Sequence, residues 1–83
     1  MSDATKQPRQ WFGTVPTICN CCANTIRDAF SDFRAHNGRW YLGCDACVAE
    51  YSCHPTEPYG MGKGQRYRRA TYNGKTVWQK SAG

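Results

Sequence analysis

Four of the six cysteines form two pairs with the same internal spacing, and this spacing is typical of a metal site. The pairs follow the pattern C-x2-C-x21-C-x2-C along the chain. Each pair can hold a metal ion from a tight turn, and four thiolates are a preferred ligand set of tetrahedral Zn²⁺. We therefore predict one zinc site with four ligands: Cys19, Cys22, Cys44 and Cys47.

The cysteines also leave alternatives open. Cys21 could replace Cys22 if the first turn were wound differently, and Cys53 or His54 could take the fourth position. Disulfides or a redox C-x-x-C motif would use the same residues, but no thioredoxin-like βαβ pattern fits into 83 residues. The N-terminal segment MSDATKQPRQ is polar and lacks the apolar stretch of a secretion signal. We therefore expect a reducing, cytoplasmic location, where cysteines serve as metal ligands more often than as disulfides.

The chain between the two cysteine pairs predicts a β-hairpin that returns the second pair to the first. Its centre is Asn37-Gly38, the preferred dipeptide for a two-residue type I′ turn. Such a turn pairs Ala35 with Trp40 and places four apolar side chains on one face. These side chains are Phe33, Ala35, Trp40 and Leu42.

The segment 44–54 predicts a short helix that Pro55 stops, with Cys44 and Cys47 at its N-terminal end. A cysteine knuckle, a hairpin and a helix that carries the second cysteine pair are similar in order to a treble-clef zinc finger. We expect a small zinc-stabilised α+β fold, with this treble-clef-like finger followed by a C-terminal basic β-hairpin.

Aliphatic side chains are few, with one Leu, two Ile and three Val among 83 residues. A chain of this size rarely builds a sufficient core without a metal or disulfide staple. We expect a disordered leader over residues 1–10, a four-cysteine zinc-finger domain over 11–57, a Gly-rich connector over 58–64, and a basic aromatic hairpin with its tail over 65–83. No apolar stretch is long enough to cross a bilayer, so a membrane is not an expected partner.

Charge is divided unevenly along the chain. Residues 1–57 contain five Lys/Arg and six Asp/Glu, whereas residues 58–83 contain six Lys/Arg and no acid. A basic segment on a near-neutral domain predicts a polyanionic partner, such as DNA, RNA or an acidic groove of a protein complex. The alternative is a basic tail that only keeps the protein soluble.

The basic segment itself predicts a second hairpin. Asn73-Gly74 favours a type I′ turn that pairs Tyr72 with Lys75 and Arg69 with Trp78. One face then alternates cations with aromatic rings that could stack on bases, although packing on the zinc core would explain the aromatic rings equally well. Packing does not account for the cations. The predicted nucleic-acid or partner contacts are Lys63, Arg66, Tyr67, Arg68, Arg69, Lys75, Trp78 and Lys80.

One family resemblance spans residues 19 to about 69. Two C-x2-C pairs around a hairpin, followed by the segment GMGKGQRY at 60–67, resemble small zinc-finger proteins of bacteriophages and prophages. The resemblance implies an accessory protein of the host cytoplasm and implies no activity. The segment 52–58 and the long tail after Arg69 depart from that pattern.

The sequence favours a non-catalytic zinc protein that binds nucleic acid through its C-terminal hairpin. The alternative is a phage-borne adaptor or inhibitor that docks on a host protein or nucleoprotein complex. An enzyme is not expected. A nuclease built on treble-clef elements needs a histidine base beside a divalent-metal ligand, and only the His36-Asn37 dipeptide is similar to that pair. Exposed aromatic residues would also allow a homodimer.

Overall fold

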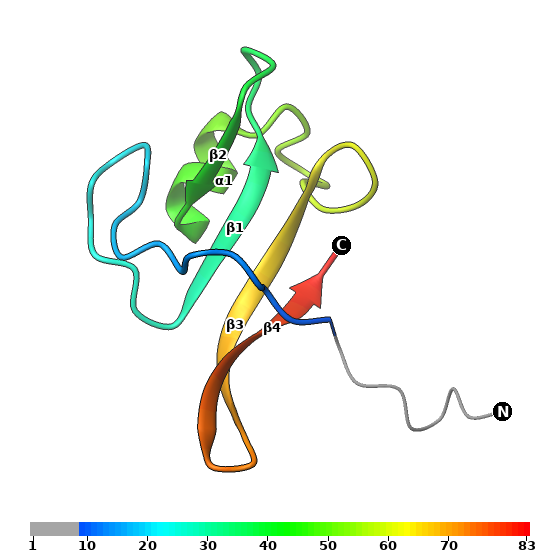
Figure 1. Ribbon diagram of the computed structural model, residues 1–83. Coiled ribbons are helices and arrows are strands. Elements are labelled where there is room, and N and C mark those ends of the chain that lie inside the picture. The colour runs from blue at the N-terminus through cyan, green and yellow to red at the C-terminus, as the bar shows by residue number, and fades with distance from the viewer. Residues whose placement is uncertain (1–8) are drawn as a thin grey trace, which may run out of the picture.

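The computed structural model of the protein describes residues 9–83, which form a four-stranded antiparallel sheet and one short helix (Figure 1). The sheet order is β2-β1-β3-β4. The elements are β1 (Ala29–Arg34), β2 (Trp40–Gly43), α1 (Asp45–Tyr51), β3 (Gly64–Tyr72) and β4 (Lys75–Ala82). This is the small α+β fold that the sequence predicts. The predicted leader lies mostly outside the described residues.

The β1–β2 hairpin forms as expected but in a different register. Phe33 pairs with Tyr41, not with Leu42, so the predicted two-residue turn is wrong by one position. The loop is one residue longer because the Ala35 carbonyl accepts a bond from the Gly38 N–H, and Gly38 takes the left-handed conformation (φ 86°). A one-residue shift exchanges the faces of β2, so Trp40 is half-exposed.

Helix α1 begins after Cys44 and ends at Tyr51, earlier than the predicted stop before Pro55. Ser52 leaves the helix because its backbone is extended (φ −61°, ψ 144°) and forms a bridge with Ala35. Tertiary pairing with the start of the β1–β2 loop therefore ends the helix before proline can do so.

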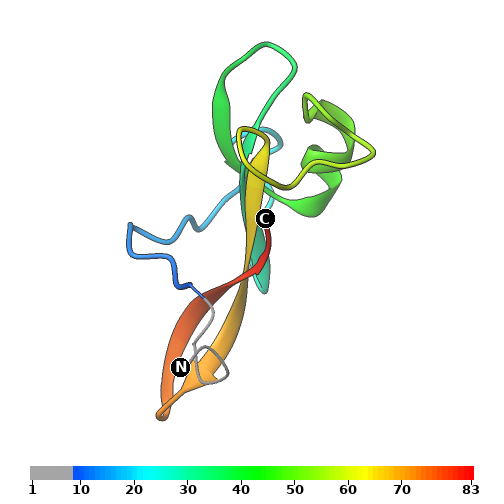
Figure 2. The same cartoon turned by 90° about the vertical axis from the view of Figure 1, so that its right-hand side faces the viewer.

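Strand β1 is buried on both faces, and each face has its own core. On one face Phe33 and Ala35 pack against Val48 of α1. On the other face Phe30 packs against Ile26 and the tyrosine Tyr67 of β3, and the N-terminal segment adds partly buried side chains over them. Figure 2 shows α1 and the N-terminal segment on opposite sides of the sheet. Both phenylalanine side chains are fully buried.

One sheet joins the predicted zinc-finger region to the predicted C-terminal hairpin. β1 pairs with β3 from Ala29↔Arg68 to Phe33↔Gly64. The approach at Gly64 is close, since a Cβ atom there would lie 3.0 Å from the Phe33 Cα. A side chain at residue 64 would therefore separate the two central strands.

The β3–β4 hairpin has the predicted register, with Arg69 opposite Trp78 and Tyr72 opposite Lys75. Asn73 and Gly74 both have positive φ (52° and 75°), as a type I′ turn requires. The hairpin projects beyond the end of β1, away from the turn between β1 and β2 (Figure 1). Its outer strand also pairs with residues 9–11 through the Gln10↔Gln79 bridge and flanking backbone bonds.

Candidate metal centre

The four cysteines with paired spacing come together at one end of the sheet. Their sulfur atoms all lie within 4.8 Å of one another, and the Sγ atoms of Cys22 and Cys44 are 3.7 Å apart. All six thiols are free, and this separation is far longer than the roughly 2.0 Å of a disulfide bond. The cluster can hold a metal ion. Among residues 9–83 the cluster does not include the alternative ligands Cys21, Cys53 and His54.

The first pair of cysteines lies on a tight turn that is fastened to β2. The Ala23 N–H donates to the Cys19 carbonyl (3.0 Å), and Ala23 takes a left-handed conformation (φ 63°) to close the turn. Asn20 exchanges two bonds with the edge of β2, because its N–H donates to the Leu42 carbonyl and its Oδ1 accepts from the Leu42 N–H, both at 2.9 Å. The turn therefore has a defined position on the sheet.

The second pair of cysteines is placed by the start of α1. Cys44 is the N-cap residue, and its carbonyl accepts the Val48 N–H at 3.0 Å. Cys47 then lies in the first turn and is buried. The Cys44 N–H also donates to the Cys19 sulfur at 3.4 Å, so the two pairs are linked through backbone as well as through the cluster.

Burial and hydrogen bonding act in opposite directions on these thiols. Burial tends to raise the pKa of Cys19, but backbone N–H groups of Cys22, Cys44 and Cys21 outweigh it and lower the pKa to about 6. For Cys47, burial and then its hydrogen bonds to the neighbouring thiols raise the pKa far above the ordinary value. Four thiols this close cannot all ionise without a cation, which is the chemistry of a metal-binding cluster.

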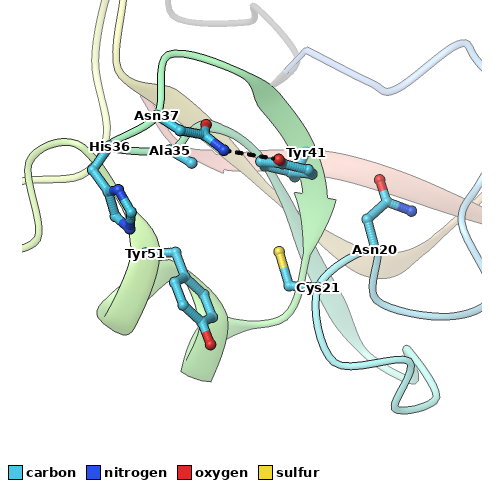
Figure 3. Close-up of a pocket in the computed structure, with 7 residues that line it drawn as sticks. All are labelled: Asn20, Cys21, Ala35, His36, Asn37, Tyr41 and Tyr51. Atoms are coloured by element: carbon cyan, nitrogen blue, oxygen red, sulfur yellow. Dashed lines mark hydrogen bonds between the residues drawn. The ribbon is translucent and has the colours of Figure 1, made fainter.

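A cavity of about 360 Å³ lies between the cysteine turn, the β1–β2 loop and α1 (Figure 3). His36 and Tyr51 face each other there with ring centroids 6.2 Å apart. Asn37 is committed to its loop, since its Oδ1 accepts the Arg39 N–H (2.9 Å) and its Nδ2 donates to the Tyr41 hydroxyl (3.1 Å). The side-chain amide of Asn37 is therefore occupied, and the His36 imidazole has no free amide group beside it.

The two aromatic residues that were candidates for base stacking pack against the core, Tyr67 buried and Trp78 half-buried. Tyr67 is 7% exposed and stacks on Phe30 with centroids 5.5 Å apart. Trp78 packs on the same phenylalanine ring at 5.3 Å. Of the two interpretations of these aromatic residues, packing on the core is the one that the structure shows.

Three of the predicted contact cations form ion pairs with acids from the first part of the chain. Arg66 binds both carboxylate oxygens of Asp45 (3.0 and 2.9 Å), which ties β3 to the start of α1. The expectation that packing within the fold leaves the cations unexplained is therefore wrong for these three. The pairs are Lys63–Glu57 (2.7 Å), Arg66–Asp45 (2.9 Å) and Arg69–Asp28 (2.8 Å).

The other predicted contact cations, Arg68, Lys75 and Lys80, have no ion-pair partner within residues 9–83. Arg68 and Lys75 are exposed on one face of the hairpin, and Lys80 is half-buried on the other. The predicted contact residues therefore divide into a group packed on the core, an ion-paired group and a free cationic group. Only the last is available to a partner without first breaking a contact within the fold.

Sequence reasoning missed two positioning residues. The Trp11 ring packs against both Phe30 and Tyr67 at 5.3 Å, and the Trp11 backbone N–H donates to the Trp78 carbonyl (2.8 Å). Asn20 fastens the cysteine turn to β2. A signal existed for Trp11, since a large aromatic residue in an aliphatic-poor chain is a core candidate, whereas none existed for Asn20.

No protein-family model, curated protein or solved structure matches the chain. The resemblance to phage zinc-finger proteins therefore stays a prediction. No helix within residues 9–83 is long and apolar enough to cross a membrane.

Proposed function

We propose that the four clustered cysteines bind one Zn²⁺ ion and that the protein is a non-catalytic nucleic-acid-binding protein. For the metal, the supporting observation is the arrangement of the sulfur atoms. Tetrahedral Zn²⁺ with Zn–S bonds of about 2.3 Å separates its sulfur ligands by about 3.8 Å. The 3.7 Å between the sulfurs of Cys22 and Cys44 fits this edge, and the whole cluster lies within 4.8 Å.

Zinc with four protein ligands plays a structural role, because no position remains open for substrate. The ion would join the cysteine turn to the start of α1, in a protein whose two cores are small. The Cys21 and Cys44 N–H groups already donate to the Cys19 sulfur (3.3 and 3.4 Å), which is how backbone commonly supports a thiolate ligand.

Native mass spectrometry of the purified protein tests the metal. We expect one zinc ion per chain, lost in Cys19→Ser and retained in Cys21→Ser. The second variant is a matched control, since Cys21 is a neighbouring thiol outside the cluster. Chelation should unfold the wild-type protein, as followed by circular dichroism. Full retention of the fold after chelation would refute a structural zinc site.

For nucleic acid, the observation that carries the proposal is an acid-free hairpin that extends beyond the rest of the sheet (Figure 1). Arg68 and Lys75 are exposed on one of its faces, and Lys80 lies on the other. Within residues 9–83, the acids without an ion-pair partner are Asp32 and Glu50, neither of which belongs to this hairpin. A phosphate backbone is the polyanion that complements such a surface.

Fluorescence anisotropy with labelled DNA and RNA, titrated at several salt concentrations, tests this part. Three phosphate contacts predict a log–log salt slope of about −2 to −3. The double variant Arg68→Ser/Lys75→Ser should bind more weakly and reduce the slope by about two. The control Arg34→Ser/Arg39→Ser removes the same charge at the opposite end of the molecule and should bind nearly as wild type. Equal losses in both variants, or no salt-dependent binding, would refute the proposal.

A protein partner is the second candidate, and one observation favours it. Phe12 and Met61 are 91% and 98% exposed, so both apolar side chains are available to a partner. An adaptor, such as a phage-borne protein acting on a host complex, would use them as anchors. Capture of the same partner from lysate with and without nuclease separates the two candidates, since a protein contact survives nuclease treatment.

A further inference from the structure

The end of the β3–β4 hairpin is a two-stranded ribbon with no third strand beside it. β1 pairs with β3 only as far as Ala29↔Arg68, whereas β3 and β4 stay paired up to Tyr72↔Lys75. Row 69/78 is still held on both sides, because the Arg69 N–H donates to the Asp28 carbonyl and the Trp11 N–H donates to the Trp78 carbonyl. Three residues in each strand, 70–72 and 75–77, extend past these last flanking contacts. At about 3.4 Å per residue this ribbon is roughly 10 Å long before its turn. Figure 2 shows it extending away from α1.

The tip of this ribbon is narrow and uncharged except for one lysine. Thr71 faces Thr76 across one face, and Tyr72 faces Lys75 across the other. The turn adds the amide of Asn73, and a Cβ at Gly74 would find no atom within 4 Å, so nothing flanks the tip. All of these side chains are exposed. Hydroxyl, amide and methyl groups of this kind are the ones that contact base edges.

Cations flank the place where the ribbon joins the sheet. Arg68 lies opposite Gln79 and Lys80 lies opposite Tyr67, so the two cations occupy neighbouring rows on opposite faces. Neither has an ion-pair partner within the part of the chain that the structure describes. A polar, acid-free tip with a cation on each face behind it is complementary to a groove walled by phosphates.

We propose that this ribbon inserts into the major groove of double-stranded DNA, with its tip at the base edges and Arg68 and Lys80 at the two phosphate walls. This inference rests on the proposed nucleic-acid function and specifies its partner. The major groove of B-DNA is about 12 Å wide and admits a two-stranded ribbon, whereas the minor groove is only about 6 Å wide. The major groove of an RNA duplex is too deep and narrow for side chains to read.

Methylation by dimethyl sulfate tests the inference, because it modifies guanine N7 in the major groove and adenine N3 in the minor groove. The substrates are a mixed-sequence DNA duplex, the RNA duplex of the same sequence and the single DNA strand. We expect the DNA duplex to bind most tightly and the protein to protect guanine N7 while leaving adenine N3 reactive.

Two substitutions at one exposed position test the tip of the ribbon. Thr76→Glu places a carboxylate inside a groove whose two walls are negatively charged phosphates, and it should weaken binding to the DNA duplex about tenfold or more. Thr76→Gln has nearly the same size without the charge, and its affinity should change about twofold or less. Circular dichroism and zinc content should be unchanged in both variants, since the Thr76 side chain is exposed.

The outcomes separate this inference from the proposed function. Salt-dependent binding that protects only adenine N3, protects neither groove, or favours single strands or RNA would overturn the groove model and keep the nucleic-acid function. Equal effects of Thr76→Glu and Thr76→Gln would likewise overturn it. Failure to bind any of the three substrates would overturn both.

Discussion

Replacing Gly64 with alanine tests the packing of the two central strands. The new Cβ would lie 3.0 Å from the Phe33 Cα and 3.1 Å from the Asp32 carbonyl oxygen. Both atoms belong to backbone in the middle of the sheet, and Phe33 is fully buried, so neither can move away cheaply. Overpacking of this kind costs about 1–3 kcal/mol. For a protein of this size, a loss of about 2 kcal/mol corresponds to a fall in Tm of about 8–16 °C.

The measurement is thermal and urea unfolding by circular dichroism in zinc-containing buffer, with metal content checked for each variant. Gly62→Ala is the matched control, because Gly62 lies in the preceding loop with φ 76° and open space around it. Its cost should come from backbone strain alone, about 1 kcal/mol. If Gly64→Ala is no less stable than Gly62→Ala, the close contact between β1 and β3 does not exist as described.

Three further changes probe other parts of the structure. Gly43→Ala would bring a Cβ to 2.9 Å from the fully buried Phe33 ring and should lower the free energy of unfolding by about 1–3 kcal/mol in urea, and unchanged stability would contradict that geometry. Ala23→Gly removes the strain of a left-handed alanine (φ 63°) and should raise the free energy of unfolding by about 0.5–1 kcal/mol, as measured in urea. Asp45→Asn should lower that free energy by only about 0.5 kcal/mol at neutral pH, since the Asp45 carboxylate in its ion pair with Arg66 is exposed to solvent. The hydrogen bond from Arg66 lowers the pKa of Asp45 below its ordinary 3.8, so this contribution is present above that pH and should vanish as the pH falls through the lowered pKa.

Features set by local turn chemistry could be predicted from the sequence. Asn73-Gly74 defines the register of its hairpin because both residues accept positive φ and the flanking strands have no competing partner at the tip. The paired cysteine spacing likewise selects the four cysteines whose sulfur atoms the fold brings together. Short-range geometry is sufficient for the hairpin register and for the spacing within each cysteine pair, whereas the two pairs meet only through long-range contacts.

Features set by tertiary contacts could not be predicted in the same way. Asn37-Gly38 carries the same local signal as Asn73-Gly74 but adopts a longer loop, and the resulting register places Tyr41 against the core of Phe33 and Leu42 against the core of Phe30. Amphipathic alternation describes a strand with one buried face, and it fails for a strand buried on both. The ion pairs of the basic segment could not be predicted from the sequence for a related reason. Arg69 and Asp28 are distant in sequence and meet only when β3 pairs with β1.

Because β1 is buried on both faces, the chain cannot be divided into two parts that each have a complete core. A peptide that stopped at residue 57 would keep every cysteine of the cluster but lose Tyr67, which covers Phe30, and the backbone partner of β1. An isolated hairpin would lose the strand on which its own aromatic residues rest. Either half, fused to another scaffold, would therefore expose apolar surface that the other half normally covers. Only the intact four-stranded sheet can be transferred to another protein with both of its cores complete.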